Sequence, residues 1–588
     1  MKRFLPAAIL LFAVIWVALS LLPAPERGAF DLAAFGRLPV LADGRMKPLD
    51  TIARNALLML QGRQRLETKE GRTVAPVQWL LDVFYRPAEA DAYPVFRIDN
   101  PDVLSLFNLT PADGQGRVRF SFIQLQAGVG ELDRQARLAA ETESALRSPF
   151  QRGVIDLQQH LAYYERLGYS CQPPDRPDFA ADLADAARFR ACRPGFEAMN
   201  TFGLLRLIPP AAGGEWSTPG RILAAAAAPA DVDTRVFLFA AIGHAWSDGQ
   251  SESFNALVRN YRLELAAGFP GLVRRCGLEA YFNRADPFAT SESLYLLAFL
   301  LAAISWLRWP ETLGPAAYRL AGLACALATA GIAARMWLEG RPPVTNLYSS
   351  ALFIGWGSAV LCLVLERLNR NGVAVSAGAF LGFATLVIAH HLSLGGDTME
   401  MMRAVLDSNF WLSTHVVTVT VGYASTFLAG FLAIVYILRG VLTKSLDKAT
   451  ADSLGRMVYG IVCFATFFSF IGTVLGGIWA DQSWGRFWGW DPKENGALII
   501  VLWNSTILHC RWGGLIRQRG LMVLAVIGNI ATAWSWFGVN MLGIGLHSYG
   551  FTQAAFYGLV VFAASQLLLI GLAGLPLARW RSFRPAAA

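Results

Sequence analysis

The sequence is poor in charge and lacks the cysteine motifs that carry redox chemistry. Only 16% of its 588 residues are charged, whereas a soluble protein carries about 25%, which excludes a wholly soluble protein. The seven cysteines form no Cys-x-x-Cys and no Cys-x-x-Cys-His, so the chain has neither a thioredoxin-like motif nor a covalent attachment site for c-type haem. No Ser/His/Asp triad, P-loop or cysteine nucleophile is apparent either. Any catalysis would therefore act by positioning its substrates rather than through a covalent intermediate.

Apolar residues are abundant instead, and they are unevenly distributed. They make up 54% of the chain and gather in long runs after about residue 290. These runs predict nine spans, and a further apolar run near the N-terminus makes ten, each near the roughly 20 residues that a bilayer requires. The predicted fold class is a polytopic α-helical membrane protein of about ten spans with a mainly α-helical extracytoplasmic N-terminal domain. The nine spans are about 291–306, 315–334, 349–365, 373–392, 412–438, 457–478, 496–510, 520–538 and 551–577.

The net charge of +8 would suit nucleic acid, but the cations are placed otherwise. Lys and Arg concentrate in alternate loops between the spans, as the positive-inside rule requires. An N-terminus in the cytoplasm fits every loop, and it predicts a multi-pass protein of the cell's inner membrane without nucleic-acid partners. The cation-rich loops hold Arg308, Arg367, Arg370, Arg439, Lys444, Lys448, Arg456, Arg511, Arg517 and Arg519, and the tail holds Arg579, Arg581 and Arg584.

The N-terminal segment predicts a membrane anchor at 1–24. Lys2 and Arg3 precede an apolar stretch from Phe4 to Leu22, as in a signal peptide, but no small-x-small cleavage site comes after it. An uncleaved anchor is therefore favoured over a cleaved signal. Under both interpretations the chain beyond residue 24 is exported.

Residues 25–288 are expected to form the extracytoplasmic domain, and 289–588 the transmembrane domain. Apolar residues recur at helical spacing along several stretches of 25–288, and strand alternation is sparse, as around 117–124. A docking or spacer module is the favoured interpretation. Three cysteines there would allow one disulfide, with no pairing readable from sequence. The helical stretches are 49–61, 77–85, 131–146, 158–166, 235–246 and 253–266.

A tryptophan-rich segment at 479–495 is the most unusual stretch of the chain. Trp484, Trp488 and Trp490 stand among glycines and charges in Trp484-Gly-Arg-Phe-Trp488-Gly-Trp490-Asp491-Pro-Lys-Glu494. Tryptophan is enriched at membrane interfaces, so an aromatic belt is one interpretation. The alternative is a site for a flat aromatic ligand, because glycines allow rings to pack closely on a flat surface.

Histidines at the outer ends of spans favour the ligand. His415 and His547 are placed on the same predicted side as the tryptophan segment, and imidazole is a common axial ligand of haem iron. A histidine at a span end also serves as an interfacial anchor. His390 and His391 are the competing outer histidines. Adjacent side chains on a helix point about 100° apart, so at most one of the two can face a given site, and we expect structural roles for them.

The segment resembles the "WWD" signature of haem-handling proteins of cytochrome c biogenesis. Residues 409–423, 508–511 and 543–549 are similar to the CcsA branch, the membrane subunit of the system II cytochrome c synthase. The resemblance covers about 294–577. More weakly, Gly44-Arg45-Met-Lys47-Pro48-Leu-Asp50-Thr51 resembles an extracytoplasmic extension seen in some relatives.

The resemblance implies a function and a set of site residues. The protein would bind haem b non-covalently at the outer face and deliver it for covalent attachment to apocytochrome c. His415 and His547 would be axial ligands, and the haem would lie against Trp484, Trp488, Trp490, Asp491 and Glu494. His509 would be the family's intramembrane histidine, a further ligand of haem iron, or else a side chain near Arg511 at the inner face. The implied partners are apocytochrome c, thiol-reducing factors and a CcsB-type membrane protein, which would supply the histidine that pairs with His509.

Two departures from the family pattern stand out. Tyr348 is followed by Ser349 where relatives often have glutamate, so any role of that carboxylate is absent. Asn495 and Gly496 stand where many relatives have tryptophan, so we expect the first turn of that span to pack differently.

Two other functions remain open. One is a haem transporter without lyase activity. The other is an electron-transfer subunit with b haems, which would need histidine pairs at matching depth, and only His509 is predicted to lie deep in a span.

Overall fold

The structure is a computed structural model, and it describes residues 4–22, 28–143, 146–176, 178–210, 214–400, 402, 406–542 and 553–583. The chain divides into two compact units. Unit 1 comprises 1–22, 285–392 and 402–588, and unit 2 comprises 23–284 and 393–401. Each unit is described by itself.

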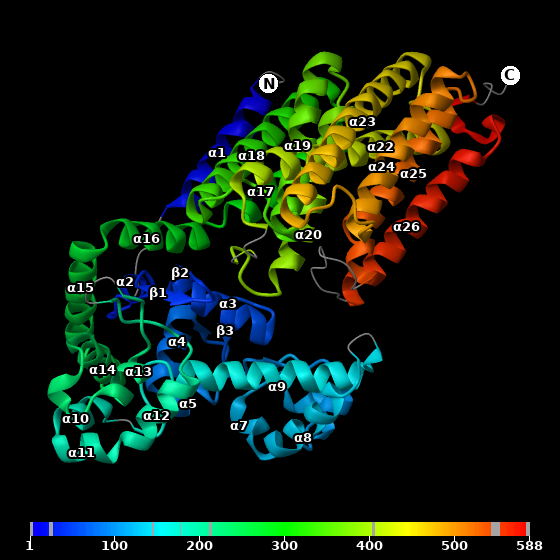
Figure 1. Cartoon of the computed structure of the whole chain (residues 1–588). Helices are drawn as coiled ribbons and strands as arrows, with labels where there is room; N and C mark the ends of the chain where they lie inside the picture. Colours follow the sequence, from blue (N-terminus) through cyan, green and yellow to red (C-terminus); the bar gives the residue numbers. More distant parts are fainter. Residues whose placement is uncertain are drawn as a thin grey trace. The chain divides into compact units, whose positions relative to one another are not determined.

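Unit 1 is a bundle of long helices (Figure 1). Helix α22 packs against α23, α25 and α19, whereas α17 packs against α18, which also contacts α1 and α19. Each of the ten predicted spans coincides with a helix among the described residues. The helices are α1 (Leu5–Leu21), α17 (Pro287–Ser305), α18 (Pro310–Glu339), α19 (Leu347–Asn369), α20 (Val373–Ser393), α22 (Val417–Leu442), α23 (Lys448–Trp484), α24 (Pro492–Trp512), α25 (Gln518–Trp536) and α26 (Gln553–Gly574).

Seven helical segments are long and apolar enough to cross a membrane among the described residues, so the protein is a multi-pass membrane protein. The other three predicted spans correspond to α1, α24 and α25, of 17, 21 and 19 residues. These three either fall short in length or carry more polar residues. Ten is therefore an approximate count of the spans.

Local sequence explains where the helices of unit 1 begin and end. Helix α18 starts at Pro310, whose missing N–H costs nothing in a first turn, and it stops at Gly340 in the left-handed conformation. The side chain of Asn346 accepts a hydrogen bond from the Ser349 amide and starts α19. The Ser349 that departs from the family pattern thus completes this cap.

Unit 2 is mainly helical, and its described strands pair into three two-stranded antiparallel sheets. β1 (Pro39–Ala42) pairs with β2 (Arg45–Pro48), β3 (Leu66–Glu67) with β4 (Thr73–Val74), and β5 (Phe96–Arg97) with β6 (Arg119–Phe120). The helices are α2 (Leu32–Gly36), α3 (Leu49–Gln61), α4 (Pro76–Tyr85), α5 (Pro87–Ala90), α6 (Pro101–Ser105), α7 (Phe122–Leu125), α8 (Val129–Ala140), α9 (Pro149–Gly168), α10 (Phe179–Ala184), α11 (Ala186–Ala191), α12 (Arg193–Phe202), α13 (Pro219–Ala225), α14 (Thr234–Ser247), α15 (Ser251–Gly268) and α16 (Pro270–Ala285).

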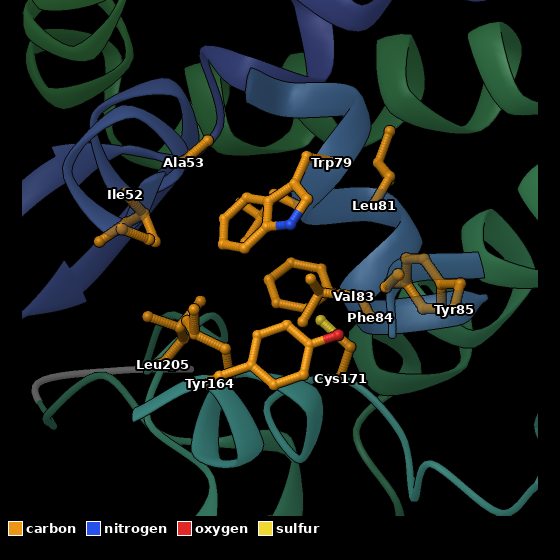
Figure 2. Close-up of a cluster of buried hydrophobic side chains, with 14 of the residues drawn as sticks. Ile52, Ala53, Trp79, Leu81, Val83, Phe84, Tyr85, Tyr164, Cys171 and Leu205 are labelled. Atoms are coloured by element: carbon orange, nitrogen blue, oxygen red, sulfur yellow. The ribbon is translucent and has the colours of Figure 1, made fainter. Parts of the chain in front are cut away.

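A single large apolar core fills unit 2. Figure 2 shows Trp79 and Phe84 of α4 among side chains from α3 and α9, and Trp79 and Leu81 are fully buried. A helix is present at each of the six expected places in this half, but α8 ends at Ala140 rather than at 146, and α9 is longer than predicted. Cys171, Cys192 and Cys276 are buried free thiols, so the disulfide that the composition allowed is not formed.

Candidate functional site

A cavity opens in unit 1 between the helix ends that carry His415 and the tryptophan-rich segment. It encloses about 1210 Å³ of space between protein atoms, open mouth included. Its wall is mostly apolar, as is usual for sites that bind organic ligands. The wall includes His415, Tyr423, Gly476, Trp479, Trp484, Trp488, Lys493, Glu494, Met402, Leu406 and Leu412.

His415 lies on a π-helical turn, η6 (Leu412–Val416), at the start of α22. Its ring Nδ1 lies 2.8 Å from the carbonyl oxygen of Gly472, which can only accept, so Nδ1 carries a proton. In the neutral tautomer of this ring the lone pair is on Nε2. A backbone carbonyl that fixes the tautomer in this way is the usual support of a metal-ligating histidine. A π-turn inside a helix also commonly marks a functional site.

Glycines on α23 allow the imidazole to approach this closely. A Cβ at position 476 would lie 2.6 Å from Cε1 of His415, and one at position 472 would lie 2.7 Å from Cα of Val419. Both distances are far inside van der Waals contact. Gly472 and Gly476 therefore let α22 and α23 cross closely, as small residues four apart do in membrane helices. The prediction from sequence did not include them, although their spacing was a readable signal.

Aromatic rings form one side of the cavity. Trp479 meets the His415 ring edge-on, with centroids 5.8 Å apart. Trp411 stacks on Trp479 with planes 13° apart, and its indole N–H donates to Gln482. Trp484 and Trp488 also line the cavity. The site thus combines an oriented imidazole with flat apolar rings.

The tryptophan-rich segment, which lies between the spans predicted at 457–478 and 496–510, is partly helical. Helix α23 continues to Trp484 and ends at Gly485, whose φ of +68° suits glycine. The chain then turns and re-enters a helix at Pro492. Because the helix stops at Gly485, Trp484 and Trp488 do not share a helix face, yet both reach the cavity.

The two acidic residues of the segment have local partners. Asp491 accepts from the Lys493 amide at 2.8 Å, and Glu494 accepts from the Gly489 and Asp491 amides at 2.8 and 3.1 Å. Together they form a capping box that starts α24. Glu494 also lines the cavity, whereas Asp491 is buried beside it and supports the turn.

Trp490 points elsewhere. Its side chain is 71% exposed, its backbone has the left-handed φ of +56°, and its ring meets Trp488 edge-on at 6.2 Å. Trp490 is not among the described residues that line the cavity.

Lys493 places an amine in the cavity wall, which the prediction from sequence did not include. Its Nζ donates to the Trp536 carbonyl at 2.8 Å and to the side chain of Asn540 at 3.3 Å. Tyr423 lies in the same wall and shares a hydrogen bond of 2.6 Å with Ser535.

Three other predicted histidines, His390, His391 and His509, are not part of the described lining. His509 lies in the last turn of α24 with an exposed side chain, apart from the described lining of the cavity. His390 and His391 end α20, are exposed, and do not belong to that lining either. His547 lies outside the described residues.

Residues 344–547, which include the cavity wall around His415, match the family described as "Cytochrome C assembly protein". The chain is 28% identical to "Cytochrome c biogenesis protein CcsA" of Synechococcus sp. (strain CC9902) over 302 residues, which cover 45% of this chain and 98% of that protein. A protein of the same name from Parasynechococcus marenigrum (strain WH8102) is 29% identical over 264 residues, 39% of this chain and 85% of the relative.

A third relative extends the similarity into unit 2. "Protein NrfI" of Wolinella succinogenes is 26% identical over 549 residues, which cover 89% of this chain and 55% of NrfI. Residues 344–547 therefore carry a cytochrome c assembly region, and the chain is similar to CcsA-like cytochrome c biogenesis proteins.

Proposed function

We propose that the cavity binds haem b non-covalently through His415 and that the protein delivers this haem for covalent attachment to apocytochrome c. The observation that carries the proposal is the hydrogen bond from His415 Nδ1 to the Gly472 carbonyl inside an aromatic cavity. It orients the ring so that Nε2 would ligate the haem iron, and Trp484 and Trp488 offer the flat surface that a porphyrin would pack against. His547 is proposed as the second axial ligand.

The polar side chains of the cavity wall suit the carboxylate groups of haem. Haem carries carboxylate side chains, and the Lys493 amine stands in the mostly apolar wall, where it would donate to one of them. Asp491 and Glu494 hold the turn that carries Trp488 through the capping box, and Glu494 also faces the cavity. The chain thus contributes orientation and electrostatics, while the haem supplies the vinyl groups to which cysteine thiols add.

The cation distribution supports a location in the inner membrane, with the cavity, residues 25–288 and the tryptophan segment on the extracytoplasmic side. The cation-rich tail with Arg579 and Arg581 comes after α26, and Arg511 ends α24, whereas the cavity is built at the opposite helix ends of α23 and α24.

The direct test is reconstitution in cells that lack their own haem-attachment system. Expression of the chain with its membrane partner and an apocytochrome that contains Cys-x-x-Cys-His should yield cytochrome with covalent haem, measured as haem that stays with the denatured polypeptide. A transporter would deliver haem without forming the thioether bonds. If no covalent haem forms on the apocytochrome although the chain is expressed at a normal level, the lyase function is contradicted.

His509 supports the proposal that a CcsB-type membrane protein completes a second haem site. Its side chain is exposed on α24, so a ligand held there can be shared with a neighbouring subunit. An ionisable residue on a membrane helix is a functional candidate by default. The partner would supply the other histidine.

We expect His509→Ala to remove this shared haem from the co-purified complex while leaving the haem at His415 in place. The readout is haem per complex after purification from native membranes. Thr506→Ala is the matched control, since Thr506 is exposed one turn earlier on α24. A chain that holds bis-histidine haem at His509 and makes cytochrome c without any partner would refute this arrangement.

The tryptophan wall gives a further prediction. Trp488→Ala should weaken haem retention by about 1–3 kcal/mol, by analogy with the stacking of flat bases on aromatic side chains. Trp490→Ala is the matched comparison and should have a smaller effect, because its ring is exposed and absent from the described lining. Haem dissociation rates of purified variants measure the difference. Equal retention in Trp488→Ala and the wild type would favour a plain interfacial belt.

A further inference from the structure

Unit 2 contains a buried charge cluster that the haem cavity does not use. Arg45 of β2, 13% exposed, donates two hydrogen bonds of 2.9 Å to Glu279 of α16. The same guanidinium donates to Asp397 at 2.9 and 3.0 Å. One planar fork thereby holds two carboxylates in bidentate fashion, a geometry that lysine cannot reproduce.

Neighbouring groups complete the cluster. Lys47, buried on the same strand, donates to Asp397 at 3.1 Å and to Asp43 at 2.8 Å. Thr51 donates to Glu279 at 2.8 Å. Burial acts to raise the pKa of Asp397, but the Arg45 and Lys47 charges outweigh it and hold that pKa well below its usual range. A buried charge set of this kind is stable only while all its members are paired.

Asp397 reaches this cluster from a distant part of the sequence. It lies in 393–401, which comes after α20 and folds as part of unit 2, whereas the chain on either side belongs to unit 1. Met402 and Leu406, five and nine residues further on, line the haem cavity, as do Leu412 and His415. The segment is therefore fastened at Asp397 immediately before it forms the cavity wall.

A second arginine–carboxylate pair holds the following stretch of chain inside unit 1. Arg341 makes a bidentate pair with Asp407, at 2.9 and 2.7 Å. The η6 turn that carries His415 begins five residues later, at Leu412. Two arginine–carboxylate forks thus bracket the part of the wall formed by Met402 and Leu406.

We propose that Arg45, with Lys47 and Glu279, is a positioning residue for the haem cavity and acts by fixing Asp397. This inference rests on the proposed function of His415. The hydrogen bonds of Asp397 shorten the free stretch of chain before Met402, so haem binding has less conformational freedom of that stretch to restrict. The Gly-Arg-Met-Lys motif of the N-terminal half thereby acquires a role in the site of the C-terminal half.

The test uses Asp397→Asn in the full chain, purified from membranes. We expect haem affinity to fall about fivefold or more, the lower range of measured couplings between distant sites. The fraction of low-spin, doubly ligated iron should fall as well, measured by electron paramagnetic resonance. Glu131→Gln is the matched control, because Glu131 forms an exposed bidentate pair with Arg134 in the same unit.

A second variant guards against a folding defect. Arg45→Lys keeps the charge but not the fork, and it should lower haem affinity when measured at a temperature at which circular dichroism shows the variant to be folded. Wild-type affinity and spin state in either variant that folds would overturn the inference. If His415→Ala also left haem binding intact, the proposed function itself would fail. Loss in His415→Ala with no loss in the cluster variants would refute only the positioning role.

Discussion

Replacing His415 with alanine is expected to abolish haem retention in the cavity, with at least a tenfold loss of affinity. Changing a residue that only hydrogen-bonds to a metal ligand already costs about 10–100-fold, so removing the ligand itself costs no less. Cytochrome c formation should fall in parallel. Free imidazole added to the cells should partly restore it, because the vacated space beside Gly472 and Gly476 matches an imidazole ring.

His391→Ala is the matched control for this experiment. His391 ends α20, is exposed, and its ring hydrogen-bonds at Val387 rather than at the cavity. We expect its haem content to equal that of the wild type. If His391→Ala removed the haem and His415→Ala did not, the iron ligand would have to be reassigned.

Gly476→Ala is expected to reduce haem binding nearly as strongly. The new methyl would lie 2.6 Å from Cε1 of His415, so the imidazole must leave the Gly472 carbonyl. Alanine stabilises a helix relative to glycine by about 0.5–1 kcal/mol, so loss of helix propensity cannot account for the effect. Haem per chain after purification measures it.

The same helix provides the control. A Cβ at Gly460 meets nothing within 4 Å, so Gly460→Ala should leave haem content unchanged. Imidazole should rescue His415→Ala but not Gly476→Ala, because the methyl occupies the space that the added ring would fill. Haem content in Gly476→Ala equal to that in Gly460→Ala would contradict this account of the glycine.

Most of unit 1 could be predicted from hydropathy, because a bilayer admits few alternatives to a helix of about 20 apolar residues. The spans predicted at 349–365 and 373–392 correspond to α19 and α20, and the second agrees almost residue for residue. The ends of α23 were harder to predict. It runs nine residues before and six beyond the predicted span, since its polar ends lower the hydropathy without ending the helix.

The cavity was only partly predictable. The tryptophan signature and His415 stood out by composition and by their resemblance to a family. The π-turn under His415 and its bond to Gly472 depend on how α22 and α23 cross, which no local pattern specifies. Lys493 could not be predicted, because its hydrogen-bond partners lie on α25 and in the segment after it.

The clearest failure of sequence reasoning concerns 393–401. Hydropathy assigned it to a short loop between two spans, yet it folds with unit 2. Arg45 and Lys47, which pair with Asp397, are more than 300 residues away along the chain. An ion pair between such distant residues produces no periodic pattern in the sequence.

One measurement tests the central claim most directly: the haem content of the protein purified from native membranes, beside that of His415→Ala prepared in parallel. The account predicts haem b that can be extracted with acidified solvent from the wild type, in an amount equimolar with the chain at the cavity. It predicts loss of that haem from the variant, with the helix content unchanged. A wild-type protein without haem, or a variant that holds as much haem as the wild type, would contradict it.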